Sequence, residues 1–221
     1  MNKIIHQIFL DIGLTPLSER KDYVYNIEII KRNNPDWKHI LWNDKMVNDF
    51  VKKFYPEYLS IWNNFPNKFY KIDYVRYLIL NTYGGIYVDL DELNIRPFDK
   101  KLAKSKFIIG SFESKTAGNI INNNIIAIND KKYTKKLIDY CNNQLIEKKE
   151  SIPKTWKIRL FLHSVGAQMF KRFCKLNKIE TDIDTRIYFK QHKAKDFNLS
   201  WISSFGNKID YKNINNSFHY K

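Results

Sequence analysis

Short apolar runs alternate along this chain with longer segments of helical periodicity, and this alternation constrains the fold more than any other feature. Runs with strand composition occupy residues 4–10, 39–42, 86–88 and 107–112. Segments with helical spacing occupy residues 19–32, capped by Ser18, and 46–64, 68–82, 131–147 and 160–177. Because several of the strands are apolar throughout, helices should cover both faces of the sheet. We therefore expect an α/β fold with a mostly parallel sheet flanked by helices.

The sequence pattern does not decide the secondary structure of two segments. Residues 121–128 fit either a strand or a helix, and the tail from about residue 182 is loop-like with room for short strands. The chain has 221 residues, of which 43% are hydrophobic, which suits one well-filled core. No internal repeat or linker interrupts it, so we expect a single domain over residues 1–221.

The net charge of +15 raises the question of a polyanionic partner. The lysines are scattered or stand in short clusters, which is typical of a solvated surface, and we expect no nucleic-acid partner. Cys141 and Cys174 lie far apart and form no CxxC pair, which favours reduced thiols. No 18 apolar residues run together, so the pattern predicts a soluble, cytoplasmic protein, with peripheral contact to membranes left open.

The segment YGGIYVDLDEL, residues 83–93, carries two glycines and a short apolar strand that ends in Asp89 and Asp91. Residues two apart on a strand point to the same side, so both carboxylates are expected to face one ligand. Two adjacent carboxylates repel unless a cation joins them. Mg²⁺ and Mn²⁺ accept such a pair and complete their shell with phosphate oxygens. The strand end therefore predicts a clamp for a metal ion and a diphosphate.

The helix before this strand carries Asp73 and Arg76, three residues apart on one helix face. This pair is either a surface salt bridge or a carboxylate and a guanidinium presented to the ligand. Gly84 and Gly85 then permit the left-handed turn that leads from helix into strand. In α/β sheets, ligands bind beyond the carboxyl ends of the strands, where Asp89 and Asp91 stand.

Together, these residues resemble the DXD-containing glycosyltransferases of family 32, which include the α-1,4-galactosyltransferases. More distantly, the chain is similar to the catalytic domains of clostridial glucosylating toxins. The resemblance rests on Asp73-x-x-Arg76-Tyr77 followed by the run from Tyr83 to Asp91. It extends to other segments in the expected order, namely Ile4–Phe9, Asn34–Trp37, Leu41–Asp44 and Gly166–Gln168. It is strong over about residues 1–95 and faint beyond.

The resemblance implies a GT-A fold, with residues 1–95 as the donor-nucleotide half and residues 96–221 as the acceptor and sugar side. It implies a nucleotide-sugar donor, with a UDP-sugar preferred and a GDP-sugar open, and a Mn²⁺ or Mg²⁺ ion. Asp91 and Asp89 would bind the metal, with Asp89 also near the donor. By the same likeness, Asp73 and Arg76 would hydrogen-bond the donor sugar. Ile8, Phe9 and Tyr87 would line the base pocket, and Asn43 or Asp44 could reach the edge of the base.

Three further residues align with the family less closely. Glu113 and Asn123 fall where relatives place groups around the donor sugar, and Glu113 fits a solvated turn equally well. His219 corresponds to a C-terminal histidine that can join the metal site, although the Ser-Trp pair expected after it precedes it here, at Ser200 and Trp201. The chain is therefore expected to be a retaining, metal-dependent glycosyltransferase with an unidentified glycan, protein or small-molecule acceptor. A nucleotide-sugar-binding protein without turnover and a basic polyanion-binding protein remain as alternatives.

Overall fold

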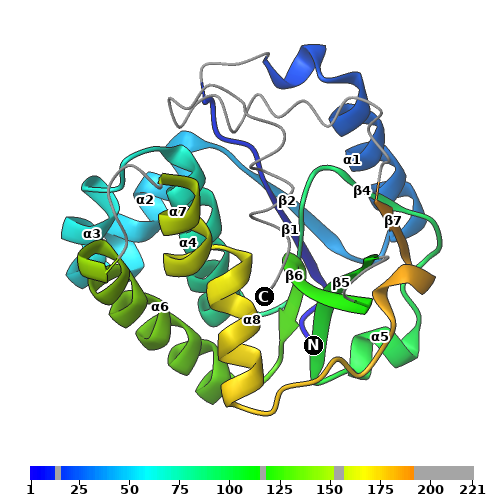
Figure 1. The fold of residues 1–221 in the computed structure, drawn as a ribbon. Coiled ribbons are helices and arrows are strands. Elements are labelled where there is room, and N and C mark those ends of the chain that lie inside the picture. The colour runs from blue at the N-terminus through cyan, green and yellow to red at the C-terminus, as the bar shows by residue number, and fades with distance from the viewer. Residues whose placement is uncertain (13–15, 115–117, 152–156, 192–221) are drawn as a thin grey trace.

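A five-stranded sheet with the order β2-β1-β3-β6-β5 forms the centre of the protein (Figure 1). The computed structural model describes residues 1–12, 16–114, 118–151 and 157–191. The strands are β1 (Ile4–Ile8), β2 (Lys38–Trp42), β3 (Ile86–Val88), β5 (Phe107–Ser114) and β6 (Gly118–Ile128). Strand β1 runs parallel to β2 and β3, whereas β6 is antiparallel to both β3 and β5. Only β6 is therefore reversed, and the expected α/β fold with a mostly parallel sheet is confirmed.

Helices cover both faces of this sheet. Helix α1 (Lys21–Asn33) lies on one side together with α5 (Lys100–Lys104) and the small sheet of β4 (Glu92–Asn94) and β7 (Phe189–Gln191) (Figure 1). The other side carries α2 (Asp44–Phe54), α3 (Leu59–Asn63), α4 (Lys68–Tyr83), α6 (Lys131–Ser151), α7 (Lys157–Ser164) and α8 (Ala167–Leu176).

Two hydrophobic clusters explain why the strand sequences are apolar throughout. Ile86 and Val88 belong to the cluster on the α1 side, whereas Tyr87 between them belongs to the larger cluster on the α4 side. In β6, Ile125 and Ile126 divide in the same way. Successive side chains of a strand point to opposite faces, so a sheet with helices on both faces needs apolar residues at every position.

Several boundaries differ from the expectation. The segment 121–128 is a strand, and it belongs to the longer β6. The helix expected over residues 160–177 is divided, because the amides of Val165 and Gly166 both donate to the carbonyl of Phe161, which ends α7. The helical region at 46–64 is interrupted by a 3₁₀ turn that begins at Pro56. Ser18 lies in a 3₁₀ turn and does not cap α1, whose first residue is Lys21.

The glycine turn between α4 and β3 forms as predicted. Gly84 and Gly85 have φ angles of 64° and 81°, a region that residues with a Cβ rarely adopt. A Cβ on Gly85 would lie 2.4 Å from the carbonyl oxygen of Ile4. The turn therefore brings the start of β3 directly beside β1.

In the four ranges that the structure describes, no helix has the length and apolar character needed to cross a membrane.

Candidate functional site

Strands β1, β2 and β3 end at the same edge of the sheet, and the predicted residues gather there. Because the three strands are parallel, Phe9, Asn43 and Asp89, the residues that follow them, are brought to one edge. The antiparallel strand β6 passes this edge with Asn123 and Asn124, since the amide of Asp89 donates to the carbonyl of Asn124 at 2.8 Å. This is the edge at which α/β sheets bind ligands.

Asp89 and Asp91 lie in a turn and not on a strand. Strand β3 ends at Val88, so the expectation that a strand directs both carboxylates to one side is wrong. The turn is closed by the amide of Glu92, which donates to the carbonyl of Asp89 at 3.2 Å. The carbonyl of Leu90 accepts a hydrogen bond from the side chain of Asn26 at 2.9 Å. The backbone of the aspartate pair is thus held by hydrogen bonds around the turn, one of which comes from the Asn26 side chain.

Asp73 and Arg76 form a buried ion pair and not a surface one. The Arg76 side chain is 3% exposed, and its Nη2 donates to Asp73 Oδ1. Its Nη1 donates to the carbonyl of Asn123 at 2.6 Å and lies 3.4 Å from Asp89 Oδ1. Arg76 therefore connects helix α4, strand β6 and the aspartate turn, which makes it the central cation of the site.

Asp73 is held on its other oxygen by a second set of contacts. The amide nitrogen of Asn123 donates to Asp73 Oδ2 and to the hydroxyl oxygen of Tyr77, each at 3.2 Å. The Tyr77 hydroxyl donates to the carbonyl of Val165 at 2.9 Å. A Cβ on Gly166 would lie 3.2 Å from Asp73 Oδ2, so the turn between α7 and α8 closes on this carboxylate. Asn123 and Gly166, both singled out from the sequence, thus meet at Asp73.

Tyr87 lies between Arg76 and Asp89. Its hydroxyl donates to Asp89 Oδ1 at 2.5 Å, and the Arg76 guanidinium carbon stands 4.5 Å from the centre of its ring. The side chain is buried in the hydrophobic cluster on the α4 side, and its hydroxyl reaches the aspartate turn. Tyr87 therefore orients Asp89 directly.

Four carboxyl groups, those of Asp73, Asp89, Asp91 and Glu92, lie near this site, and the Arg76 guanidinium lowers the pKa of the first three against the effect of burial. Burial raises the pKa of Asp73 to about 6, although Arg76 opposes this rise. Burial and then the charge of Asp89 raise the pKa of Asp91 to about 7. Burial and then Asp91 raise the pKa of Glu92 to about 8, and burial also raises the pKa of Asp89. The edge thus carries an excess of carboxylates that a further cation would stabilise.

A divalent ion fits this edge only with help from a ligand. Among the described residues, no group of three or more His, Cys, Asp or Glu side chains is arranged to hold a metal ion. Asp89 and Asp91 nevertheless offer oxygen atoms of the kind that Mg²⁺ and Mn²⁺ bind, and such ions usually take one or two carboxylates together with phosphate oxygens. The residues present fit a metal ion that arrives with a diphosphate.

The residues expected around the base lie at the ends of β1 and β2. Ile8 is buried in the core, whereas Phe9 is partly exposed. Asn43 Oδ1 accepts from the amide of Met46 at 3.0 Å and so caps helix α2. Asn43 itself is exposed at the edge.

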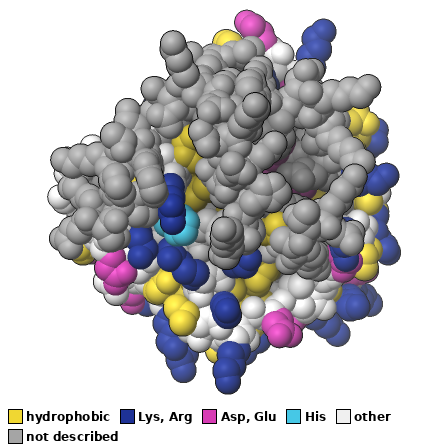
Figure 2. All heavy atoms as spheres, viewed as in Figure 1, with side chains coloured by type: hydrophobic (Ala, Val, Ile, Leu, Met, Phe, Trp, Pro, Cys, Tyr) yellow, Lys and Arg dark blue, Asp and Glu magenta, His cyan; other side chains and the backbone are white. Residues whose placement is uncertain are grey.

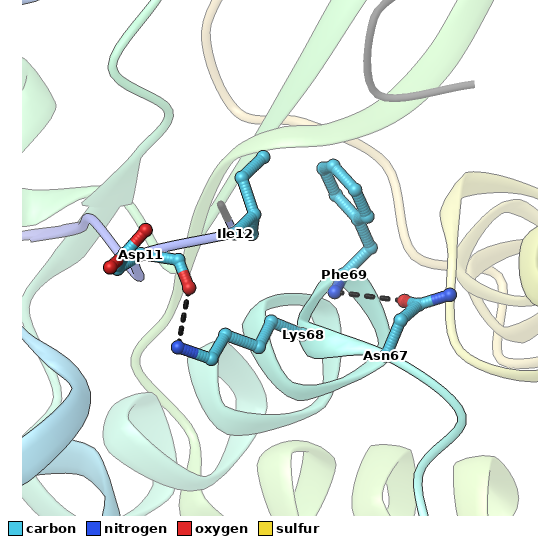
Figure 3. A pocket seen from close by; sticks show the side chains of 5 residues that line it. All are labelled: Asp11, Ile12, Asn67, Lys68 and Phe69. Atoms are coloured by element: carbon cyan, nitrogen blue, oxygen red, sulfur yellow. Dashed lines mark hydrogen bonds between the residues drawn. The ribbon is translucent and has the colours of Figure 1, made fainter. Parts of the chain in front are cut away.

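Asp44 ties three segments together at the same edge. Its carboxylate accepts from the amide of Asp11 at 2.8 Å and lies 2.6 Å from the Lys68 ammonium. Lys68 also donates to the carbonyl of Asp11 (Figure 3). A pocket of about 270 Å³ opens here, and Figure 3 shows the side chains of Ile12 and Phe69 on the same side of it. Asp44 thus supports the wall of a pocket next to the carboxyl end of β1.

The side chains of two predicted site residues, Glu113 and His219, lie outside the described part of the chain. Glu113 is part of β5, opposite Asn119 in β6, and its side chain is outside the described residues. His219 lies wholly outside the described ranges.

The sequence analysis gave no role to four residues that the structure brings to the site, namely Asn26, Tyr77, Glu92 and Asn124, although Tyr77 stands in the Asp73-x-x-Arg76-Tyr77 motif. Asn124 donates to Glu92 Oε1 at 2.5 Å, and its own carbonyl accepts from Asp89. A Cβ on Gly110 would lie 1.9 Å from Asn124 Oδ1, so only a glycine there leaves room for this amide. The signal for Asn124 was the asparagine run at 122–124 inside an apolar strand, because buried amides need partners.

Part of the chain is similar in sequence to known glycosyltransferases. Residues 20–108 match the family model described as a glycosyltransferase sugar-binding region containing a DXD motif. An inositol phosphoceramide mannosyltransferase of Schizosaccharomyces pombe is 33% identical over 114 residues, which are 50% of this chain and 34% of that protein. Mannosyl phosphorylinositol ceramide synthase SUR1 of Saccharomyces cerevisiae is 41% identical over 75 residues, or 34% of this chain and 20% of that protein. The matched part thus spans about a third or less of these relatives.

Solved structures show the same fold at low sequence identity. The catalytic domain of alpha-toxin from Clostridium novyi superposes with a TM-score of 0.56 at 11% identity, covering 99% of this chain and 82% of that one. The PaToxG glycosyltransferase superposes with a TM-score of 0.51 at 20% identity, covering 80% of this chain and 69% of that one. The family resemblance and the GT-A fold expected from the sequence are both confirmed.

Proposed function

We propose that this chain transfers a sugar from a nucleotide-sugar donor held at the carboxyl edge of the sheet, because residues 20–108 match the DXD-containing sugar-binding region of glycosyltransferases. The observation that carries this proposal is the excess of carboxyl groups around Arg76, with the pKa of Asp91 raised to about 7. Such an edge favours a ligand that brings its own cation.

Asp91 and Asp89 would hold a Mn²⁺ or Mg²⁺ ion, with Asp91 as the main ligand. When bound, the ion supplies positive charge that offsets the negative charge of the departing diphosphate. Asp91 suits this role because it is partly exposed, whereas Asp89 is already engaged by Tyr87 and Arg76.

Asp73 and Arg76 would contact the donor sugar and keep it in place. Both carboxylate oxygens of Asp73 already accept hydrogen bonds, from Arg76 and from Asn123, so Asp73 is poorly suited to attack carbon. We therefore favour a retaining reaction in which the acceptor enters on the face from which the diphosphate leaves. Phe9, Ile8, Asn43 and Asp44 would lie on the side of the nucleoside.

The matched yeast proteins favour testing a GDP-sugar donor before the UDP-sugars. The resemblance of the residues expected around the base to those of UDP-sugar enzymes favours a UDP-sugar, whereas the names of the matched yeast proteins describe mannosyl transfer. We propose GDP-mannose as the first donor, because mannose is activated as its GDP derivative in such reactions. The same names specify a phosphoinositol-containing lipid, and we propose a hydroxyl group of a polyhydroxylated headgroup or glycan as the acceptor.

A thermal-shift panel tests the proposal directly. The melting temperature is measured with GDP, UDP, GDP-mannose, UDP-glucose, UDP-galactose and UDP-GlcNAc, each with Mn²⁺ and with EDTA. A ligand at about 100 times its Kd adds roughly 2.7 kcal/mol to the stability of the folded state. We expect a shift of several degrees with one nucleotide class in Mn²⁺ and none in EDTA. Equal shifts in Mn²⁺ and EDTA, or none, would contradict the metal clamp.

A polyanion-binding protein is the second candidate, and the net charge of +15 favours it. On the described part of the face in Figure 2, the Lys and Arg side chains are spread out and do not gather in one patch. Binding of that kind falls steeply with salt and needs no metal ion. Heparin affinity measured with Mn²⁺ and with EDTA therefore separates it from a transferase.

A further inference from the structure

Asn26 is a fully buried amide in helix α1 that touches the aspartate turn. Its side chain is 0% exposed, and its Nδ2 donates to the carbonyl of Leu90 at 2.9 Å. Its Oδ1 has no hydrogen-bond partner among the described residues. Leu90 is the residue between Asp89 and Asp91, so this single hydrogen bond reaches the middle of the D-x-D sequence.

This placement costs stability, which argues against a purely structural role. A buried amide oxygen without a partner destabilises a fold by about 1–3 kcal/mol. The neighbouring inward residues of α1, Ile29 and Ile30, are apolar and pack in the ordinary way. An apolar residue at position 26 would avoid the unpaired oxygen, but it would leave the Leu90 carbonyl without this donor.

The hydrogen bond fixes the direction of Asp91. The peptide unit between Leu90 and Asp91 is planar, so holding the Leu90 carbonyl restricts the rotation that orients the backbone of Asp91. The other side of the turn is already held, because the amide of Asp89 donates to Asn124 and its carbonyl accepts from Glu92. Among the described residues, the hydrogen bond from Asn26 is the one that holds the carbonyl oxygen of the Leu90–Asp91 peptide.

We propose that Asn26 is a positioning residue, which acts through the Leu90 carbonyl to hold Asp91 in the orientation that binds a divalent cation together with a nucleoside diphosphate. The inference rests on the proposed donor site. Residues that hydrogen-bond to a metal ligand without touching the metal typically lower metal affinity by about 10- to 100-fold when they are removed. Asn26 would therefore set the metal-dependent part of donor affinity without touching the donor.

Helix α1 offers a matched control in Asn34, the residue at its carboxyl end. Asn34 is 2% exposed, and its Nδ2 donates to the carbonyl of Ile30 at 2.8 Å. Its Oδ1 accepts from the amide of Phe98 at 2.7 Å. Asn34→Ala thus removes a buried amide that makes more hydrogen bonds than Asn26, at the end of the helix away from the aspartate turn.

The first measurement compares the Kd of GDP and of UDP in Mn²⁺ and in EDTA for the wild type, Asn26→Ala and Asn34→Ala. We expect the gain in affinity from Mn²⁺ to fall by about 10-fold in Asn26→Ala. Asn34→Ala should lower the melting temperature and keep the full gain. An unchanged gain in Asn26→Ala, or equal losses in both variants, would overturn the proposal.

The second measurement needs no nucleotide and is independent of the proposed function. Amide hydrogen exchange of the segment 89–92 is followed in the metal-free protein, because exchange reports local opening. We expect faster exchange of this segment in Asn26→Ala and wild-type exchange in Asn34→Ala. Unchanged exchange in Asn26→Ala would overturn the positioning role. If the wild type binds neither nucleotide in Mn²⁺, the proposed function fails while this comparison still decides whether Asn26 holds the turn.

Discussion

At the scale of single residues, the site is a compromise between binding and stability. Asp73, Asp89, Asp91 and Glu92 all have a raised pKa, and burial is the first cause in each case. Arg76 is the cation that contacts two of them. Carboxylates that are held in this way destabilise the ligand-free fold when they ionise, and they become favourable when a cation binds.

Asp91→Asn should stabilise the metal-free protein at high pH. The folded state binds the Asp91 proton more tightly than the unfolded chain, because its pKa is raised from 3.8 to about 7. The wild type therefore loses stability as the pH rises through this window, whereas asparagine does not titrate. We expect a gain of about 3 °C at pH 8 in EDTA and a smaller gain at pH 5, since about 1 kcal/mol moves the melting temperature by roughly 2–4 °C. A variant that is less stable than the wild type at pH 8 would contradict this electrostatic account.

Arg76→Ala should be among the most damaging substitutions in the chain. It leaves Asp73 buried without its cation, which typically costs 3–5 kcal/mol, or about 6–20 °C in melting temperature at this size. Asp73→Asn combined with Arg76→Ala should recover part of that loss, because the uncompensated charge is removed. Thermal unfolding of the three variants measures this, and a double variant less stable than Arg76→Ala alone would show that the pair does not act as described.

At the scale of elements, the two glycines after α4 determine how the strand that leads to the site is placed. A Cβ on Gly85 would lie 2.4 Å from the Ile4 carbonyl oxygen, whereas the nearest atom to a Cβ on Gly84 would be 3.5 Å away in the Asn2 side chain. Both have positive φ, so the two positions differ mainly in space.

Gly85→Ala should therefore cost clearly more than Gly84→Ala. We expect about 1–2 kcal/mol for Gly84→Ala, because its φ of 64° and ψ of −149° are nearly restricted to glycine, and about 3 kcal/mol or more for Gly85→Ala, where β1 and β3 must also separate. Urea unfolding of both variants gives the comparison. Equal losses would mean that the contact with Ile4 does not constrain the sheet.

The elements of the first half could be predicted because each carries a strong local pattern. The helix at 68–82, the glycine turn and the strand at 86–88 are all present within one residue. Strand β4 was not predicted, and β7 was expected only as one of the short strands possible after residue 182, because both are three residues long and pair across about a hundred residues of chain. The same limit applied to the site: Asp73, Arg76, Asp89 and Asp91 lie within one short segment, whereas Asn26 reaches Leu90 from 64 residues away.

At the scale of the whole molecule, the acidic site at the edge of the sheet contrasts with the positive net charge of the protein. The net charge is +15, yet the described carboxyl edge is rich in acidic groups. A divalent cation and a diphosphate together can suit both features, because the ion binds the carboxylates and the net positive charge of the protein attracts the phosphates. We expect donor binding to keep its metal requirement as salt rises from 50 to 500 mM, with affinity falling less steeply than that of heparin, as measured by calorimetry at several salt concentrations.

The most direct test of the central claim is the release of nucleoside diphosphate from GDP-mannose and the UDP-sugars, with and without an added polyhydroxylated acceptor. It should be measured for the wild type and for Asp91→Asn in Mn²⁺ and in EDTA. We predict release from one donor class by the wild type in Mn²⁺, and a loss of at least about 100-fold on chelation or in Asp91→Asn, since offsetting the leaving-group charge is worth several kcal/mol. Release that continues undiminished in EDTA, or in Asp91→Asn, would contradict the account.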